Sequence, residues 1–369
     1  MPSKADPKLM ACKRRAFLAG VALAACESRS DVASSTAGVP RAIPEGGPVA
    51  TNAPPTLSPA RTEASQGPVP RRPLGLTEEQ VSAIGLGGFH LGIPTEAEAI
   101  RIMHRAIDEG ITFFDNCWDY HGGESERRMG KALADGRRDK VFLMTKVDGR
   151  TQEAAARQLE DSLHRLRTDR IDLVQIHEVI REKDPGWVFG KDGAIEALRV
   201  AQKAGKLRFI GFTGHKSPEI HLEMLRTAKA NDFRFDTVQM PLNVMDPHFK
   251  SFEKKVLPLL TEQHVGVLGM KPLGSGDILK SGAVSAEDCL RYALSLPTSV
   301  VITGCDSMQI LEQALRVARG FRPLDESARL ALLDRTRPLG EAGKFEAFKT
   351  SERFDATSRN PHWLTGGTL

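Results

Sequence analysis

The sequence predicts a closed (β/α)₈ barrel, and two observations carry this prediction. Short apolar, β-branched segments recur eight times at intervals of about thirty residues. Between them lie amphipathic segments with the apolar periodicity of helices. Strands that alternate with helices build a parallel sheet, and eight such units in 369 residues suit a barrel better than an open sheet. We also expect an N-terminal hairpin before the barrel and a C-terminal flap segment after it.

Each predicted strand is a short apolar run, and Gly or Asp marks many junctions between strands and helices. The predicted strands cover residues 81–87, 111–117, 141–147, 171–177, 209–213, 237–242, 266–271 and 299–303. The predicted helices cover residues 96–109, 123–134, 152–166, 194–204, 219–228, 250–264, 286–296 and 308–319. An open dinucleotide-binding sheet would carry Gly-x-Gly-x-x-Gly after its first strand, and residues 85–90 lack the third glycine. The barrel is therefore favoured, with its functional side chains at the carboxyl ends of the strands.

Composition and charge exclude several classes of protein. The chain is 40% hydrophobic and 27% charged, which is typical of soluble domains. Its 51 Lys+Arg and 47 Asp+Glu give a net charge of +4, and residues 1–72 supply the whole basic excess. The rest of the chain therefore has no basic face, and we expect no nucleic-acid partner. Five cysteines do not make a disulfide framework in a chain of this length.

The first 26 residues resemble an export signal. Arg14 and Arg15 precede an apolar run at residues 16–26, which is shorter than the roughly 18 residues that span a bilayer but within the range of signal peptides. The arginine pair resembles a twin-arginine signal, and residues 23–26 (Leu-Ala-Ala-Cys) resemble a lipobox whose Cys26 would be lipidated. We expect export to the periplasm or anchoring to a membrane through Cys26. The alternative is a cytoplasmic protein with a fortuitous basic and apolar start.

Residues 27–72 predict a disordered linker. They contain eight prolines and no Phe, Trp or Tyr, so they cannot bury enough apolar surface to offset the entropy of ordering. The expected organisation is therefore a leader at 1–26, this Pro/Ala/Ser-rich linker, a barrel at 73–320 and a C-terminal extension at 321–369 that packs on the barrel.

The C-terminal extension contains four aromatic residues in a polar stretch, Phe345, Phe348, Phe354 and Trp363. Two placements are open: a flap over the active site, or packing under the barrel. Near the second strand, we expect Trp118 and His121 to line the mouth of the site.

Four titratable residues follow three consecutive predicted strands. Asp115 and Tyr120 follow the second strand, Lys146 lies at the end of the third and His177 at the end of the fourth. Each alone has a structural explanation: a helix cap for Asp115, a loop aromatic for Tyr120, a rim lysine for Lys146 and a satisfied core histidine for His177. Buried charges are costly unless paired, so the four together indicate a catalytic site.

This combination suits protonation of an oxygen on which negative charge develops. A tyrosine has a pKa of about 10, and the Lys146 ammonium is expected to lower that of Tyr120. The Asp115 carboxylate would hold Lys146 charged, and His177 could donate to a substrate carbonyl oxygen. Hydride addition to a carbonyl needs such a proton donor, and the hydride implies a nicotinamide cofactor.

These residues resemble the aldo/keto reductase family over residues 72–319. The family's Asp-x-Ala-x-x-Tyr motif, followed by Gly-x-Ser-Glu, is seen from Asp115 to Tyr120 and at residues 123–126, with Cys117 in place of the alanine. The resemblance implies a reductase of small aldehydes or ketones. It assigns Tyr120 as the general acid.

The same resemblance assigns the other three residues of the set. Lys146 and Asp115 would tune Tyr120, and His177 would orient the substrate carbonyl.

The resemblance also implies a cofactor site, with the pyrophosphate on the loop after strand 7 and the adenosine ribose on the loop after strand 8. The implied cofactor residues are Gly88, Phe89, Thr213, Gln239, Met270, Lys271, Pro272, Leu273, Gly274, Ser275, Gly276, Gly304, Cys305, Asp306, Ser307, Gln309 and Gln313. NADP is the family's usual cofactor. NAD stays open, because residues 304–313 contain no Arg or Lys to hold a 2′-phosphate.

Two other functions were weighed against the reductase. A non-catalytic NAD(P)-binding sensor or partner-binding barrel would keep the same four residues, so it stays open. A metal hydrolase is not supported, because no second histidine or carboxylate cluster accompanies His177 at ligand spacing, and no metal is expected. The physiological substrate, the direction of the reaction and the oligomeric state are not predicted.

Overall fold

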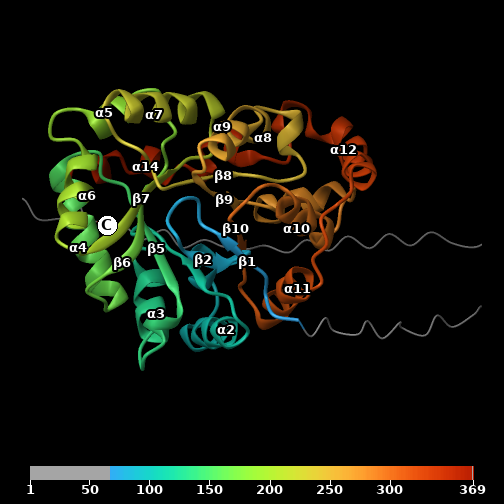
Figure 1. Cartoon of the computed structure of the whole chain (residues 1–369), viewed down its shortest axis with the longest axis horizontal. Coiled ribbons are helices and arrows are strands. Elements are labelled where there is room, and N and C mark those ends of the chain that lie inside the picture. Colours follow the sequence, from blue (N-terminus) through green and yellow to red (C-terminus); the bar gives the residue numbers. More distant parts are fainter. Residues whose placement is uncertain (1–66, 368) are drawn as a thin grey trace, which may run out of the picture. The chain divides into compact units, whose positions relative to one another are not determined.

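The computed structural model describes residues 67–367 and residue 369 (Figure 1). The arginine pair of the leader, Cys26 and the linker up to residue 66 lie outside the described residues. Within the part of the chain that the structure describes, no helix is long and apolar enough to cross a membrane.

Eight parallel strands close into a barrel. They are β3 (Ile84–Gly87), β4 (Phe113–Asp115), β5 (Phe142–Val147), β6 (Ile171–Ile176), β7 (Leu207–Thr213), β8 (Thr237–Pro241), β9 (Gly266–Met270) and β10 (Val300–Gly304). Neighbours in sequence are neighbours in the sheet, and β10 closes the barrel by pairing with both β3 and β9. The predicted fold class is confirmed. All eight strands run in one direction, so their carboxyl ends meet on one rim.

A hairpin precedes the barrel, as expected. It consists of β1 (Arg71–Pro73) and β2 (Gln80–Ser82), paired antiparallel. The predicted strand at 81–87 therefore contains two elements, the end of β2 and all of β3. The folded part also starts before the expected boundary at residue 73, because Arg72 donates hydrogen bonds to the carbonyl oxygens of Thr298 (2.9 Å) and Leu294 (2.7 Å).

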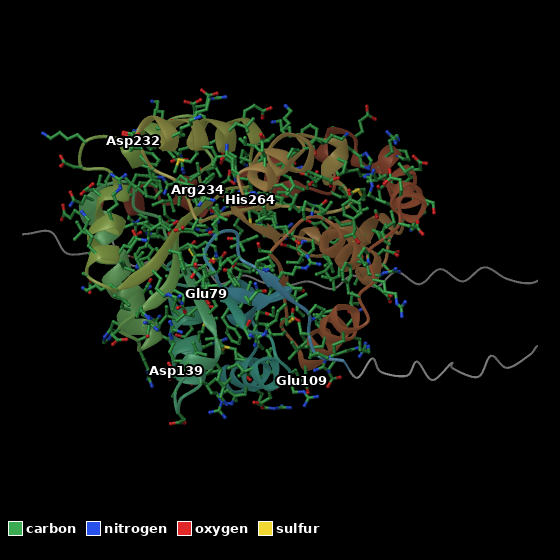
Figure 2. All side chains as sticks on the ribbon, in the orientation of Figure 1. Glu79, Glu109, Asp139, Asp232, Arg234 and His264 are labelled. Carbon is green, nitrogen blue, oxygen red and sulfur yellow. The ribbon has the colours of Figure 1, made fainter. Side chains whose placement is uncertain are left out.

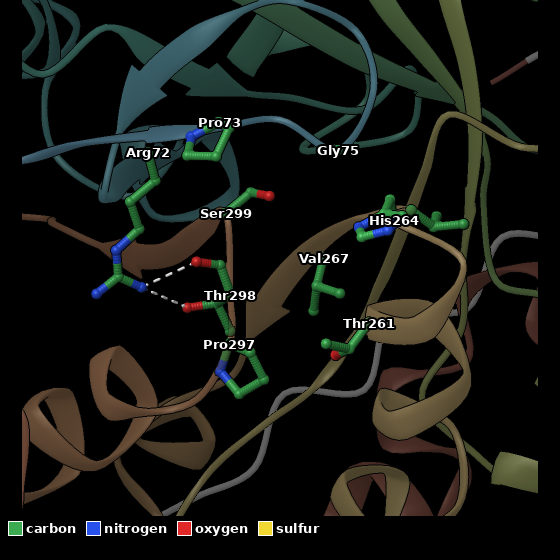
Figure 3. A pocket seen from close by; sticks show the side chains of 10 residues that line it. Arg72, Pro73, Gly75, Thr261, His264, Val267, Pro297, Thr298 and Ser299 are labelled. Atoms are coloured by element: carbon green, nitrogen blue, oxygen red, sulfur yellow. Dashed lines mark hydrogen bonds between the residues drawn. The ribbon is translucent and has the colours of Figure 1, made fainter.

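The hairpin lies at the amino ends of the strands, opposite the rim that carries the candidate site. A pocket beside it is lined by Arg72, Thr298 and residues that precede or begin β9 and β10 (Figure 3). Nearby, Arg234 donates to the carbonyl oxygen of His264 (3.0 Å) and so links the loops that lead into β8 and β9 (Figure 2).

Helices surround the barrel (Figure 1). The helices between strands are α1 (Gly88–Leu91), α2 (Glu96–Asp108), α3 (Glu124–Ala132), α4 (Gln152–Leu166), α5 (Asp184–Phe189), α6 (Ala194–Lys203), α7 (Pro218–Ala230), α8 (Phe252–Lys255), α9 (Leu257–Glu262), α10 (Ala286–Ser295) and α11 (Met308–Arg319). Hydroxyl side chains cap several of their first turns, including Thr95, Thr151 and Ser307, each accepting from a backbone N–H. Such caps explain why the predicted starts of α2, α4 and α11 coincide with the observed ones.

The helix predicted at 250–264 is two short helices, α8 and α9. Pro258 lies in the first turn of α9. Proline has no N–H to donate to the preceding turn and its ring crowds that turn, so a continuous helix is interrupted here.

Two apolar clusters form the core. The smaller one fills the barrel and includes Phe113, Phe142, Met144, Leu173 and Leu268. Phe113 and Phe142 stack with centroids 5.3 Å apart. The larger cluster lies between the strands and the surrounding helices. This arrangement makes the strands a rigid support for the loops at their carboxyl ends.

After α11 the chain forms α12 (Glu326–Gly340), α13 (Ala347–Thr350) and α14 (Ala356–Arg359). The segment from residue 341 to residue 367, called the C-terminal strap below, contacts loops that follow the carboxyl ends of β5, β6, β7 and β8. Helix α14, labelled in Figure 1, is held by Glu178 after β6, which accepts from the backbone N–H groups of Ala356 and Thr357. Of the two placements left open by the sequence, the strap lies on the rim that carries the candidate site and not under the barrel.

Candidate active site

The candidate site is built around a buried ion pair. The Lys146 ammonium in β5 forms an ion pair with the Asp115 carboxylate at the end of β4, and the two residues are 1% and 3% exposed. Lys146 also donates to the Asn116 carbonyl oxygen (2.8 Å) and to the Tyr120 hydroxyl (3.4 Å). The second Asp115 oxygen accepts from the Gln239 amide (2.6 Å). Three predicted catalytic residues and one predicted cofactor residue therefore form one connected network.

The barrel explains why these residues meet. Asp115 is the last residue of β4, and its register partner in β5 is Met144. Lys146 lies two residues beyond Met144, so its side chain points into the barrel on the same side as that of Met144. Side chains that are 31 residues apart in sequence thus form one pair at the carboxyl rim.

Tyr120 lies on the loop after β4, at the outer edge of the network. Its ring meets the ring of Phe89 edge-on at 5.4 Å and that of His177 at 5.9 Å, measured between centroids. Phe89 itself is 49% exposed. The phenol therefore stands at the boundary between the buried ion pair and the open mouth of the site.

The pKa of Tyr120 differs from the sequence-based expectation. Burial raises it well above its usual value, and the carboxylates of Asp115 and Asp119 raise it further. The expected lowering by Lys146 fails for a physical reason: the lysine is already neutralised by Asp115, so the pair exerts little net positive field on the phenol. Tyr120 is thus a fully protonated phenol at neutral pH.

His177 follows β6 and is held by residues that the sequence analysis did not single out. Its Nδ1 lies 2.8 Å from Asp148 Oδ1, 3.2 Å from Cys117 Sγ and 3.7 Å from Asp119 Oδ1. The expectation that no carboxylate cluster accompanies His177 is therefore wrong. The available signal was position: Asp148 directly follows β5, so its side chain had to join the same rim.

The two carboxylates beside His177 are unusual acids. Burial raises the pKa of Asp148 to about 8 and that of Asp119 to about 7. Burial also lowers the pKa of the His177 imidazole. The Arg150 guanidinium does not neutralise these acids directly, because it pairs with Asp184 (2.9 Å).

The barrel interior offers a place for an amide group. Gln239 in β8 is buried, and its Oε1 has no hydrogen-bond partner among the described residues. Thr213, at the end of β7, is also buried and donates to Met270 Sδ (3.8 Å). A nicotinamide carboxamide could donate its N–H to the unpaired Gln239 oxygen, so the residues present fit the ring end of a nicotinamide cofactor.

The loop after β9 has the backbone form of an anion cradle. Lys271, Gly274, Ser275 and Gly276 all have positive φ, between 55° and 87°. A Cβ at Gly276 would meet no atom, so the loop is open on that side. Successive backbone groups in such conformations form concave sites for anions.

Lys271 is the charged group of this loop. Its ammonium lies over the rings of Phe354 (4.8 Å) and Phe348 (5.6 Å) of the C-terminal strap. Burial lowers its pKa to about 8. Pro272 and Leu273 continue the loop, and Leu273 packs against the larger core cluster.

The loop after β10 leads into α11. Gly304 is packed so closely against His90 that a Cβ there would overlap the ring, and Cys305 is buried. Asp306 precedes Ser307, whose hydroxyl caps α11. The remaining two implied cofactor residues, Gln309 and Gln313, lie on α11, with Gln309 exposed and Gln313 half-buried.

Gly88 has a packing role in the barrel that does not depend on a bound ligand. A Cβ there would lie 2.6 Å from the Asp115 carbonyl oxygen, so only glycine lets α1 approach the end of β4. The Ser125 hydroxyl donates to the Gly88 carbonyl oxygen (2.7 Å).

The C-terminal strap is tied to the rim by buried polar contacts. Glu178, next to His177, accepts from the backbone N–H groups of Ala356 (2.9 Å) and Thr357 (2.8 Å) and from the Thr357 hydroxyl (2.6 Å). His215 Nε2 lies 2.9 Å from Asp355 Oδ1. The strap is therefore a fixed wall of the candidate site.

Trp118 does not line the mouth, contrary to expectation. It is 1% exposed, donates from Nε1 to Asp161 (3.0 Å) and meets the ring of Trp363 edge-on. Its neighbours in α4 and the strap enclose it on the outer side of the barrel. His121 is exposed, and its Nε2 lies 2.7 Å from the Phe89 carbonyl oxygen.

Comparison with known proteins adds an independent observation. The sequence model of the Aldo/keto reductase family matches residues 83–287. The chain is 32% identical over 224 residues to a Bacillus subtilis protein named "Uncharacterized oxidoreductase YrpG", covering 55% of this chain and 66% of that protein. It is 30% identical over 205 residues to "Aldo-keto reductase YhdN" of the same organism, covering 51% and 57%. The match spans less than two thirds of each of these relatives.

A solved structure is similar over more of the chain. The holo form of aldo-keto reductase AKR11C1 from Bacillus halodurans superposes with a TM-score of 0.61 at 25% identity, covering 72% of this chain and 96% of that one. A putative aldo-keto reductase from Pseudomonas aeruginosa, at 24% identity and a TM-score of 0.56, covering 69% of this chain and 97% of that one, supports the fold alone.

Proposed function

This chain belongs to the aldo/keto reductase family, and from that premise we propose that it reduces an aldehyde or ketone with a nicotinamide cofactor. The observation that carries the proposal is the connected network of Asp115, Lys146, Tyr120 and Gln239 at the carboxyl rim. It places a protonated phenol next to a buried ammonium and beside an unpaired amide oxygen.

The proton chemistry follows from the phenol and its neighbours. The cofactor supplies the hydride. As negative charge develops on the carbonyl oxygen of the substrate, Tyr120 gives it the phenolic proton. The resulting phenolate lies beside the Lys146 ammonium, which stabilises it by charge and can hydrogen-bond to it. The ion pair with Asp115 holds the Lys146 side chain at this position.

His177 is proposed to orient the carbonyl. Its Nδ1 is occupied by the thiol and carboxylates described above, so only Nε2 remains to face a substrate. The imidazole can donate from Nε2 only when the ring proton resides there.

The cofactor is proposed to bind across the rim. Gln239 and Thr213 would receive the carboxamide, the loop at residues 271–276 the pyrophosphate, and the loop at residues 304–307 the ribose. NADPH is the proposed form. NADH is the alternative, because residues 304–313 offer no Arg or Lys to a 2′-phosphate.

The location of the protein is proposed from the leader alone. We propose twin-arginine export, with a lipid anchor on Cys26 and residues 27–66 as a tether to the folded part. The mass of the mature N-terminus in a native host tests this: cleavage before Cys26 with an added diacylglycerol group is expected, and an intact leader would contradict it.

One assay tests the activity. The purified chain is mixed with NADPH or NADH and a panel of aldehydes and ketones, and loss of the reduced-cofactor absorbance is followed. Turnover with at least one carbonyl is expected, faster with NADPH. Tight cofactor binding without turnover of any substrate would favour the alternative, a non-catalytic nucleotide sensor.

A further inference from the structure

Four donor atoms of different chemistry converge beside the proposed active site. They belong to Cys117, Asp119, Asp148 and His177, and they all lie within 4.8 Å of one another. Cys117 and Asp148 are 0% exposed. The atoms come from the loops after β4, β5 and β6, so three rigid strands fix their positions.

Hydrogen bonding does not satisfy this cluster. Nδ1 of His177 faces Asp148 (2.8 Å), Cys117 (3.2 Å) and Asp119 (3.7 Å). A ring nitrogen makes one hydrogen bond in the ring plane, either as donor or as acceptor, so Nδ1 cannot satisfy all three groups. Asp148 Oδ2 and Asp119 Oδ1 are buried and have no hydrogen-bond partner among the described residues. Buried carboxylate oxygens normally have partners, so the cluster has unused ligand capacity.

Nearby cations do not pair with the carboxylates of this cluster. Lys146 donates to Asp115, and the Arg150 side chain donates to Asp184 and to backbone carbonyl oxygens, including that of His177 (2.7 Å). Among the described residues, neither cation forms an ion pair with Asp119 or Asp148.

A thiol, an imidazole and a carboxylate could also suggest a nucleophilic triad, but the geometry excludes it. In a triad the nucleophile and the carboxylate bind opposite nitrogens of the imidazole. Here Cys117 and Asp148 both approach Nδ1. In addition, burial raises the pKa of the Cys117 thiol well above its usual value, which is the reverse of an activated nucleophile.

We propose that Cys117, Asp119, Asp148 and His177 form a site for one divalent transition-metal ion, and that zinc is the ion that fits it. Thiolate, imidazole and carboxylate are the three ligand types that zinc takes in proteins. A soft thiolate disfavours magnesium and calcium, which prefer oxygen ligands alone. The metal would displace the thiol proton of Cys117 and any proton held by the Asp119 and Asp148 carboxyl groups, and these protons pass to solvent on binding.

The distances suit a tetrahedral ion. Metal–ligand bonds of about 2.0–2.3 Å place neighbouring donors about 3.2–3.7 Å apart. The separation of His177 Nδ1 from Cys117 Sγ (3.2 Å) must widen by about 0.4 Å to reach the roughly 3.6 Å between a nitrogen and a sulfur ligand, and that from Asp119 Oδ1 (3.7 Å) must shorten by about 0.4 Å to reach the roughly 3.3 Å between a nitrogen and an oxygen ligand. The separation from Asp148 Oδ1 (2.8 Å) must widen by about 0.5 Å. A small rotation of the carboxylate achieves this, because its other oxygen is unpaired.

Metal binding would also select one tautomer of His177. With Nδ1 on the metal, the ring proton must reside on Nε2, which is the form that can donate to a carbonyl oxygen. This consequence rests on the proposed function, whereas the metal site itself does not.

Cobalt(II) titration of the purified full-length chain, after removal of metal with a chelator, tests the site directly. Tetrahedral cobalt with a thiolate ligand absorbs in the visible and shows a sulfur-to-metal band in the near ultraviolet. We expect both features to saturate at one cobalt per chain and to disappear when zinc is added. Zinc should also raise the melting temperature of the chain.

Variants assign the ligands. Cys117→Ser should abolish the sulfur-to-metal band. It should also lower the affinity for cobalt by more than about 10- to 100-fold, which is the loss typical of residues that only hydrogen-bond to a metal ligand. Cys289→Ser is the matched control, because Cys289 is equally buried but lies on α10. It should leave the cobalt spectrum unchanged, as should Cys12→Ser combined with Cys26→Ser.

Asp119→Asn provides a second, milder variant, because asparagine keeps the size and shape of the aspartate side chain. It should weaken cobalt binding in a chain whose circular dichroism is unchanged. The proposal is overturned if cobalt gives no thiolate band, or if the band persists in folded Cys117→Ser, or if it is lost in the Cys12→Ser, Cys26→Ser chain. These readouts do not depend on turnover, so failure of the reductase assay leaves them interpretable.

Discussion

The Lys146 ammonium lies 3.4 Å from the Tyr120 hydroxyl, while the same ammonium is held in a buried ion pair by Asp115. The phenol therefore stays protonated in the resting site. The lysine stabilises it only after the proton has left, when the phenolate carries a negative charge. The arrangement favours proton donation over proton abstraction.

Replacing the phenol tests this role. Tyr120→Phe should lower kcat by about 10²–10⁴-fold, the usual contribution of a general acid, with little change in cofactor affinity. Tyr292→Phe is the matched control, because Tyr292 is the only other tyrosine and its hydroxyl donates to Glu253 on a distant helix. Steady-state kinetics and cofactor fluorescence titration measure both effects. Wild-type turnover in Tyr120→Phe would remove the residue from the mechanism.

Breaking the buried ion pair should destabilise the fold as well as the reaction. Lys146→Met leaves the Asp115 carboxylate buried and uncompensated, which typically costs about 3–5 kcal/mol in the free energy of unfolding. Urea denaturation measures the loss. The double variant Lys146→Met, Asp115→Asn removes the orphan charge and should recover part of it. Equal stability of the single variant and the wild type would show that water reaches the pair.

The buried Lys271 ammonium is predicted to make the free energy of unfolding depend on pH in the alkaline range. Burial lowers its pKa from 10.5 to about 8, so between these values the folded chain binds fewer protons than the unfolded chain. Stability therefore rises with pH in this window, as the cost of burying the ammonium is relieved. Relative to Lys271→Met, the wild type should gain about 1–3 kcal/mol between pH 8 and about pH 10.5.

Denaturation curves of both proteins across this range give the difference, in which other alkaline groups cancel. If the difference in the free energy of unfolding between wild type and Lys271→Met stayed constant across this pH range, the Lys271 ammonium beside the Phe354 ring would be well solvated.

The hydrogen bonds that Glu178 accepts are predicted to limit the mobility of the C-terminal strap. Glu178→Ala removes the acceptor of three hydrogen bonds from Ala356 and Thr357. Amide hydrogen exchange of the strap should then rise by at least about tenfold, corresponding to about 1.4 kcal/mol of local stability. Glu182→Ala, at an exposed position on the same loop, is the control. Unchanged exchange in Glu178→Ala would mean that other contacts alone hold the strap.

The barrel was predictable because its repeat is local. Each strand needs only a short apolar run and each helix only its own periodicity, and Gly or Asp marked many of the junctions. The hairpin strand β2 merged with β3 in the prediction, because Ala83, the one residue between them, is not a turn-forming residue. Asp115, Lys146, Tyr120 and their contacts followed from the rule that strand ends meet on one rim.

The strap and the cluster around His177 were harder to predict, because long-range contacts define them. Lys349 is fully buried between Asp246 and Glu346, and nothing local in the sequence marks that pairing. Asp148 had the correct position, but its proximity to Cys117 depends on how two loops turn after leaving the sheet. The Tyr120 pKa was misjudged for a related reason: the effect of a lysine depends on what already neutralises it.

The pairing of β3 with β10 joins residues near 84 to residues near 301. Until the ribosome has delivered that last strand, the nascent sheet has two unpaired edges that can recruit other chains. Premature termination before residue 300 would therefore yield an aggregation-prone product instead of a smaller working enzyme.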